Sequence, residues 1–232
     1  MKVENRTFVV SGSSSGLGLA TVQLLLSKKA NVAITDRSAP PESLLTSTGT
    51  PLGGIVNCAG IAPVAATIDS EGKSHWLKVW EWAIAVNLTG SFNLNRLVPE
   101  HLVKFEPEDG EDGERGVVVF VSSSAAYEGP PGATAYSATK GAIRSLTLPL
   151  ARDLARHAVR VVSIAPGPFT SALTSVLNET NRKNILDNGT LYPQRFGRPE
   201  EFAKTVLWIL ECAYVNGESV RLSAGGRLPA KL

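Results

Sequence analysis

Three kinds of polar side chain that could carry proton chemistry stand close together in the sequence: Tyr136, Lys140 and the serine cluster at 122–124. Residues four positions apart on a helix share one face, so the ammonium group of Lys140 would lie near the phenol of Tyr136. A nearby positive charge favours the phenolate and would lower a tyrosine pKa that is ordinarily about 10. Such a tyrosine could exchange a proton with an alcohol or a carbonyl, as hydride-transfer chemistry requires. Tyr136 and Lys140 could also be ordinary polar residues at the start of a helix. Other parts of the chain must therefore distinguish a catalytic pair from this alternative.

A glycine-rich turn, residues 11–18, follows the first predicted strand and opens directly into a predicted helix. Glycines let the backbone turn tightly and approach a pyrophosphate, and a helix N-terminus offers it free N–H groups and a positive dipole. Asp36 ends the second predicted strand, about 20 residues beyond this turn, where a carboxylate can accept hydrogen bonds from the adenosine ribose. This favours NAD over NADP, although Arg37 could in principle pair with a 2′-phosphate. The turn residues expected to bind the cofactor are Gly12, Ser15, Gly16, Leu17 and Gly18.

Helix-like segments separate most of six short, β-branched apolar runs, and this alternation predicts an α/β fold in which helices wrap a parallel sheet. The acidic stretch 106–114 has the charge and the glycines of a solvated loop. We expect strands at Thr7–Val10, Asn31–Thr35, Gly54–Val56, Val117–Val121, Arg160–Ala165 and Ser219–Leu222. We expect helices at Gly18–Ser27, Leu77–Lys104, Tyr136–His157 and Glu200–Glu211.

The composition fits a single soluble domain spanning 1–232, with 43% hydrophobic residues and a formal net charge of +2. This near balance of charge gives no broad basic field, so we expect no nucleic-acid partner. No apolar run reaches the length of about 18 residues that a membrane span needs, and the first residues are too polar for a secretory signal. The two cysteines, Cys58 and Cys212, do not stand at metal-ligand spacing, so neither a metal site nor a disulfide is expected.

Taken in chain order, the motifs resemble those of the short-chain dehydrogenases/reductases. The resemblance covers nearly the whole chain and implies a doubly wound, Rossmann-like parallel sheet with strand order 3-2-1-4-5-6-7. It also implies a nicotinamide cofactor that lies across the carboxyl ends of the strands. The matching positions are Gly12, Gly16 and Gly18, then Asn57-Cys58-Ala59-Gly60, Asn87, Ser123, Tyr136, Lys140 and Pro166-Gly167.

Catalytic roles follow from this resemblance. Tyr136 resembles the general acid/base, and Ser123 resembles the hydroxyl that orients the substrate oxygen. Lys140 would hold the nicotinamide ribose and lower the pKa of the tyrosine, while Asn87 would maintain a water-linked proton relay through Lys140. Ser122 and Ser124 fall on the opposite face of the strand from Ser123, so they are interpreted as structural hydroxyls.

Cofactor contacts and a substrate lid also follow from the resemblance. Asn57, Cys58, Ala59 and Gly60 would line the cofactor near the adenine ribose. The loop around the nicotinamide would contain Pro166, Gly167, Phe169 and Ser171, with Ser171 where a threonine usually binds the carboxamide. The segment 169–195 follows this loop, is polar, and is therefore expected to be a mobile substrate lid.

Within the family, the chain most resembles the type 2 3-hydroxyacyl-CoA dehydrogenases, which also oxidise hydroxysteroids. Segments 57–62, 116–118, 127–129, 148–154 and 164–167 carry this likeness. The favoured reaction is therefore NAD-dependent oxidation of a 3-hydroxyacyl-CoA to the 3-ketoacyl-CoA. The alternatives are a biosynthetic ketoreductase and a cofactor-poor interaction protein of the same fold. The resemblance also suggests a homotetramer or a dimer built through the long helices.

The C-terminus Ala230-Lys231-Leu232 is a conservative version of the Ser-Lys-Leu peroxisomal address. Peroxisomal β-oxidation needs a 3-hydroxyacyl-CoA dehydrogenase, so a peroxisomal location is consistent with the favoured reaction. Without that address we expect a cytoplasmic or mitochondrial enzyme.

One departure from the family lies between Asp36 and Asn57, where 20 residues replace a helix, a strand and a second helix. Prolines and glycines in this stretch leave room for at most a two-turn helix near Glu42–Thr46. We therefore expect a sheet without its usual third, edge strand and the flanking helix, so that strand two becomes the edge. The family's aspartate facing the adenine is also missing. This predicts weaker NAD binding with the catalytic geometry kept.

Overall fold

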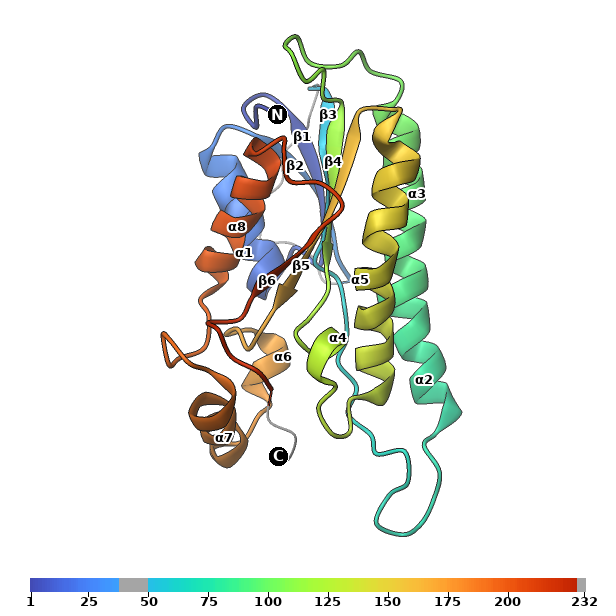
Figure 1. Cartoon of the computed structure of the whole chain (residues 1–232), viewed down its shortest axis with the longest axis vertical. Coiled ribbons are helices and arrows are strands. Elements are labelled where there is room, and N and C mark those ends of the chain that lie inside the picture. The colour runs from blue at the N-terminus through green and yellow to red at the C-terminus, as the bar shows by residue number, and fades with distance from the viewer. Residues whose placement is uncertain (38–49, 229–232) are drawn as a thin grey trace.

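A computed structural model describes residues 1–37 and 50–228 of the chain (Figure 1). The short helix expected near Glu42–Thr46 and the C-terminal tripeptide lie outside the described residues. The remaining chain forms a central sheet with helices on both faces, as the alternation of apolar runs predicts.

Six parallel strands form the sheet, in the order β2-β1-β3-β4-β5-β6. Each contains or closely matches one of the predicted strands, so the α/β prediction is confirmed. Among the described strands β2 pairs only with β1, whereas the missing edge strand stays a prediction because 38–49 are not described. The strands are β1 (Thr7–Ser11), β2 (Asn31–Thr35), β3 (Leu52–Asn57), β4 (Gly116–Val121), β5 (Val159–Pro166) and β6 (Ser219–Leu222).

The register of the strands aligns their carboxyl ends. Ser11 of β1 stands opposite Thr35 of β2 on one side and Asn57 of β3 on the other. Asn57 in turn stands opposite Phe120 near the end of β4. Segments that follow these strands therefore emerge at one edge of the sheet, where parallel α/β folds bind ligands.

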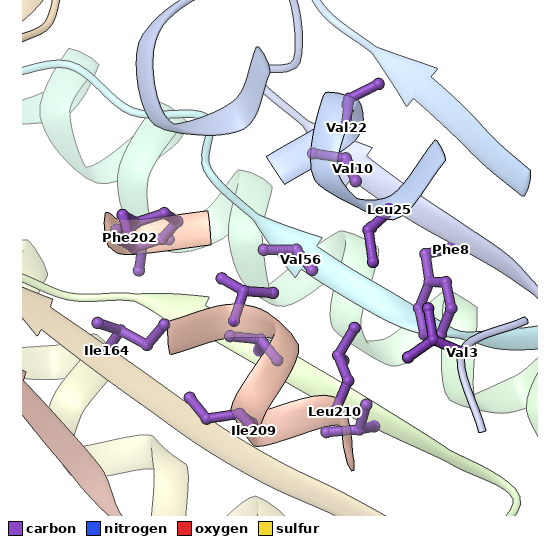
Figure 2. Packing of buried hydrophobic residues seen from close by; sticks show 14 of the residues in the cluster. Val3, Phe8, Val10, Val22, Leu25, Val56, Ile164, Phe202, Ile209 and Leu210 are labelled. Carbon is purple, nitrogen blue, oxygen red and sulfur yellow. The ribbon is translucent and has the colours of Figure 1, made fainter. Parts of the chain in front are cut away.

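Helices α1 (Gly16–Ser27) and α8 (Pro199–Glu211) lie side by side on one face of the sheet, and α3 (Ser91–Leu102) and α5 (Thr134–Ala155) cover the other (Figure 1). Figure 2 shows the first of these layers, where Phe202 and Leu210 of α8 and Leu25 of α1 pack onto apolar strand residues. Burying side chains of this size contributes about 1.5–3 kcal/mol each. These two layers hold the carboxyl ends of the strands in place.

The helix predicted at Leu77–Lys104 is divided into three parts. It begins as α2 (Leu77–Ala83), continues as a π-helix, η2 (Ile84–Gly90), and ends as α3. π-Helical turns are rare and are frequently found at functional sites. Asn87 lies in this turn, so the irregularity falls on a predicted catalytic residue. None of the described helices is long and apolar enough to cross a membrane.

The acidic stretch 106–114 is a loop, but the prediction that it is solvated is wrong at its end. Glu114 is buried and accepts a hydrogen bond of 2.6 Å from Nε of Arg160. Its other carboxylate oxygen lies 2.9 Å from the amino group of Met1. Glu108 is likewise paired with Arg6, at 2.9 Å. Distant basic groups thus draw part of this loop against the sheet.

Candidate active site

The turn between β1 and α1 requires glycine at specific positions. Gly12 has φ +65°, and a Cβ added there would lie 2.7 Å from the backbone nitrogen of Ala59. A Cβ on Gly18 would collide with the carbonyl oxygen of Gly12. Ser15 is the N-cap residue of α1, and Gly16, with φ +51°, is the first residue of that helix. The glycines therefore leave the backbone at the N-terminus of α1 without side chains that would cover it, as a pyrophosphate site requires.

Leu17 differs from its neighbours in this turn because its side chain is partly buried against the core of the α1 and α8 layer. Its contribution to a phosphate site is therefore limited to its backbone N–H. The sequence predicts Leu17 as a cofactor-binding residue but does not show whether its side chain or its main chain would make the contact.

Asp36 stands just beyond β2 and is attached to the turn. Its Oδ2 accepts a 2.9 Å hydrogen bond from the backbone N–H of Ser14. The carboxylate also lines a cavity of about 300 Å³, together with Asn57 at the end of β3 and Ala59 just after it. Both polar atoms of the Asn57 side chain are buried without a hydrogen-bond partner in the described part of the chain. The bare turn, the carboxylate and the unsatisfied amide fit an adenosine dinucleotide.

Ser123, Tyr136 and Lys140 are brought together where β4 ends and α5 begins. Ser123 is hydrogen-bonded to the phenol of Tyr136. Nζ of Lys140 lies 5.7 Å from the centroid of the Tyr136 ring and donates a 2.8 Å hydrogen bond to the carbonyl of Val121. Ser122 donates from its hydroxyl to the carbonyl of Lys140, at 2.8 Å, as expected of a structural residue. The hydroxyl, phenol and ammonium predicted from the sequence thus share one site.

The electrostatics of this site differ from the prediction. Burial raises the pKa of Tyr136 above its ordinary value, and the hydrogen bond with Ser123 only partly offsets this. Lys140 is itself buried, which lowers its pKa to about 8, although the nearby thiol of Cys58 acts in the opposite direction. The expected lowering of the tyrosine pKa by Lys140 is therefore wrong for this geometry. Removal from water is the largest cause of both shifts.

Asn87 ties three segments of the site together. Its Nδ2 donates to the carbonyl of Ile61 at 2.8 Å, and its Oδ1 accepts from the N–H of the same residue at 2.8 Å. Nδ2 also donates to Oγ1 of Thr139, at 3.1 Å, and that hydroxyl donates to the carbonyl of Tyr136, at 2.8 Å. The π-helical turn therefore fixes both the segment after β3 and the first turns of α5.

Gly60 lies where the two halves of the site meet. A Cβ at this position would lie 3.3 Å from Oδ1 of Asn87 and 3.3 Å from Nζ of Lys140. A larger residue would crowd both predicted catalytic groups. Cys58, two residues earlier, has its pKa raised to about 12 by burial, only partly countered by the charge of Lys140. Its thiol is therefore protonated, and its role at a cofactor would be through the main chain.

The loop after β5 reaches the same edge of the sheet. The carbonyl of Pro166 accepts from the N–H of Ser124, at 2.8 Å, and the N–H of Gly167 donates to Leu222 of β6, at 2.9 Å. Ser171 lies next to the glycine turn, with its Cβ 3.4 Å from where a Cβ on Gly16 would be. Pro166, Gly167 and Ser171 thus border the predicted cofactor site.

The side chain of Phe169 packs into the core beside the predicted cofactor loop. Its ring is buried and packs edge-on against Phe202 of α8, with the ring centroids 6.3 Å apart. The ring also covers Gly197, where a Cβ would collide with it. Its ring therefore belongs to the core, while the residue also lines a cavity with Pro168 and Arg195.

The predicted lid, 169–195, contains two helices, α6 (Ala172–Ser175) and α7 (Glu179–Gly189), which lie with α4 (Ala125–Glu128) toward the lower end of Figure 1. The lid ends at Arg195, whose guanidinium makes two hydrogen bonds, of 2.7 and 2.8 Å, to the carboxylate of Glu201. Several large apolar side chains of the lid are exposed, so the sequence interpretation of a polar segment missed part of its character. They are Leu173, Val176, Leu191 and Tyr192.

Comparisons with known proteins agree with this geometry. A family model described as short chain dehydrogenase matches residues 42–182. The 3-hydroxyacyl-CoA dehydrogenase type-2 proteins of Bos taurus and Homo sapiens are each 36% identical to the chain over 255 residues, covering 97% of both sequences. A crystal structure of 3-hydroxyacyl-CoA dehydrogenase type-2 from Mycobacterium avium superposes with a TM-score of 0.89, at 30% identity and full coverage of both chains.

The alignment lengths also bear on the shortened segment. The alignment with the Bos taurus protein has 255 positions, whereas 97% of the 232-residue chain is about 225 residues. About 30 aligned positions therefore have no residue in this chain. A deficit of this size could hold the strand and the helix that are expected to be missing between Asp36 and Asn57, while its location stays a prediction.

Proposed function

The chain belongs to the short-chain dehydrogenase family, and on that premise we propose that it is an NAD-dependent dehydrogenase of 3-hydroxyacyl-CoA substrates. The observation that carries the proposal is the assembly of Ser123, Tyr136, Lys140 and Asn87 at the carboxyl edge of the sheet, beside a glycine turn shaped for a dinucleotide. A bound nicotinamide would supply the hydride acceptor for oxidation and the hydride donor for reduction.

The residues of the chain have distinct parts in this reaction. The hydroxyl of Ser123 would hold the substrate oxygen next to the phenol of Tyr136. In oxidation the phenolate of Tyr136 takes the hydroxyl proton as the substrate carbon loses its hydride, and in reduction the phenol returns that proton. Lys140 and Asn87 would keep the site rigid. Because burial raises the pKa of Tyr136, the phenol is the form present near neutral pH, and alcohol oxidation should accelerate as the pH rises.

Asp36 supports the choice of NAD. Its carboxylate is fixed at the turn by the N–H of Ser14, beside the cavity proposed for the adenosine. A 2′-phosphate at this place would meet a negative charge, and the neighbouring Arg37 would have to overcome that repulsion. The hydroxyls of an unphosphorylated ribose would instead donate to the carboxylate.

The substrate class rests on the relatives and on the lid. The relatives named above are 3-hydroxyacyl-CoA dehydrogenases, and the segment 169–195, which we propose as the substrate lid, exposes apolar side chains. An acyl chain would bury such side chains and gain from the hydrophobic effect. A ketoreductase that acts on another bulky ketone would make the same use of them, so substrate trials must separate the two reactions.

The test is turnover of acetoacetyl-CoA with NADH, followed by the loss of absorbance of the reduced nicotinamide. We expect steady consumption by the wild-type protein and a loss of at least about a hundredfold in Tyr136→Phe, the usual scale of general acid catalysis. Tyr214→Phe is the matched control, because this tyrosine is fully exposed on the surface. A folded wild-type protein without turnover, or a fully active Tyr136→Phe, would contradict the proposal.

Self-association is a second part of the proposal. The long helices expose large apolar side chains that a second copy of the chain could cover. Light scattering on the purified protein would show a dimer or a tetramer, and a monomer would contradict this part alone. The exposed side chains include Trp76, Trp80 and Trp82 near α2, Phe92 and Leu97 of α3, and Leu148 of α5.

A cofactor-poor interaction protein remains the alternative from another functional class. The deficit of about 30 aligned positions favours it. A protein that does not bind the cofactor would gain nothing from a glycine at position 12, where no side chain covers the backbone, or from an unsatisfied amide beside the cavity. These two features favour the enzyme. Direct measurement of NADH binding separates the two.

A further inference from the structure

The guanidinium of Arg221, in β6, makes contacts in two directions. Toward α4, its Nη1 lies 2.6 Å from Oε1 of Glu128. Toward the turn 223–226, which follows β6, Nε donates to Oγ of Ser223 at 3.0 Å and Nη2 donates to the carbonyl of Gly226 at 3.1 Å. The side chains of the ion pair are only 20% and 13% exposed. A planar group whose N–H donors have a fixed arrangement can hold all three acceptors at set positions.

The first direction leads to Ser123, whose hydroxyl is proposed to hold the substrate oxygen. Its Oγ accepts a 3.1 Å hydrogen bond from the backbone N–H of Ala125, the first residue of α4. With only four residues, α4 is too short to be stable without contacts to the rest of the fold. Glu128 is its last residue, so the pair with Arg221 holds in place the helix to which the Ser123 hydroxyl is bonded.

Tyr127 adds a second attachment of α4 to β6. Its ring lies 5.1 Å from the guanidinium carbon of Arg221 and 4.5 Å from that of Arg144 in α5. Its hydroxyl donates to Oγ of Ser219 in β6, at 3.1 Å. Two consecutive residues of α4 thus contact β6, and both of them contact the same guanidinium.

The second direction leads to the proposed substrate lid. Ala224, in the turn that Arg221 holds, has φ +52°, which presents its carbonyl to the end of the lid. This carbonyl accepts hydrogen bonds from the N–H groups of Leu191 and Tyr192, at 3.2 and 3.1 Å. The turn after β6 therefore supports the lid on one side, and the same turn is bonded to the guanidinium on the other.

We propose that Arg221 is a positioning residue that links the substrate lid to Ser123. By joining α4 to the turn 223–226, it keeps the Ser123 hydroxyl against the phenol of Tyr136 while the lid rests on the turn. A displacement of about 1 Å in such a site can slow a reaction about a hundredfold. The inference rests on the proposed function.

The experiment measures kcat for acetoacetyl-CoA at saturating NADH, the dissociation constant of NADH and the free energy of unfolding. Arg221→Met and Glu128→Met should each lose at least about tenfold in kcat, with a dissociation constant for NADH within about twofold of the wild-type value. The double variant should lose about as much as Arg221→Met alone, because both substitutions break the same pair. Arg227 lies 3.8 Å from the same carboxylate oxygen and is 64% exposed, so it does not replace Arg221.

The matched control is Arg6→Met, which breaks an ion pair at the amino ends of the strands, away from the site. The side chains of Arg6 and Glu108 are 14% and 21% exposed, close to the values of the pair between β6 and α4. This variant should lose a similar amount of stability and keep the wild-type kcat. A role that is only structural would make the two pairs behave alike.

Each other outcome overturns the inference. Wild-type kcat in folded Arg221→Met or folded Glu128→Met does so, and so does an equal loss of kcat in Arg6→Met. If circular dichroism shows that Arg221→Met is unfolded, Arg221→Lys takes its place with the same expected loss, because a lysine cannot hold the carboxylate and both turn oxygens with one planar group. A folded wild-type protein without turnover refutes the proposed function itself, so the two failures are distinguishable.

Discussion

Replacement of Asn87 by alanine tests whether this side chain holds the active site together. The substitution removes three hydrogen bonds, two to the backbone of Ile61 and one to Thr139. At about 1 kcal/mol for each bond, the free energy of unfolding should fall by about 3 kcal/mol. For a chain of this size the melting temperature should fall by about 6–12 °C.

Urea denaturation and differential scanning calorimetry would measure this loss. Asn93→Ala is the control, since Asn93 lies in the adjoining helix α3, is exposed and, within the described part of the chain, has a side chain that bonds only to Arg96. Its stability should stay within about 0.5 kcal/mol of the wild type. A free energy of unfolding of Asn87→Ala within about 1 kcal/mol of the wild-type value would show that something other than this amide holds the π-helical turn.

Three further predictions follow from single contacts. Gly12→Ala should leave the fold intact but weaken NADH binding at least about tenfold. The left-handed backbone at this position and its close approach to Ala59 both disfavour a residue with a Cβ. A fluorescence titration that gives the wild-type affinity would contradict this. The pKa of Lys140 is lowered from 10.5 to about 8, so the folded state loses this proton at a lower pH than the unfolded state does. The free energy of unfolding of the wild type, relative to that of Lys140→Met, should therefore rise by about 2 kcal/mol between about pH 7.5 and about pH 10. A difference in urea midpoints that does not change with pH would count against this. Glu201→Gln should lower stability by about 1 kcal/mol at neutral pH, because the pair with Arg195 is partly exposed. The pKa of Glu201 is lowered from 4.5 to about 2, so this difference should vanish as the pH falls through that range, and a difference that persists at low pH would exclude the ion pair as its cause.

The sheet could be predicted well from the sequence because each strand is a local pattern. Runs such as 117–121 are β-branched and apolar over a length that suits a buried parallel strand. Once the strands are parallel, their carboxyl ends must meet at one edge. The meeting of Ser123 with Tyr136, and of Asp36 with the glycine turn, follows from this geometry.

Features that depend on contacts between residues far apart in the sequence could not be predicted. Glu114 lies in an acidic stretch, and only the fold brings Arg160 to it. Phe169 follows a loop motif, yet its ring packs against α8. The raised pKa of Tyr136 has the same origin. The sequence shows that Lys140 is near and so predicts a lowered pKa, but the cost of removing both groups from water depends on how deeply the fold buries them.

The π-helical turn at Ile84–Gly90 is a further case of this kind. In the segment 77–104, Gly90 stands where the π-helical turn ends, but no glycine or proline marks its start at position 84, so the pattern predicts one continuous helix. The signal present was Asn87 itself, a polar residue within a helix whose buried face contacts the sheet and α5. Its hydrogen bonds to Ile61 lie outside the helix and form only in the folded chain.

A working nicotinamide-dependent dehydrogenase must bind its reduced cofactor. NADH titration, followed by the fluorescence of the reduced nicotinamide, measures this binding. The glycine turn and the Asp36 carboxylate predict saturation with a dissociation constant of about 100 μM or below. A folded wild-type protein that shows no saturation up to about 1 mM NADH would instead favour the cofactor-poor interaction protein.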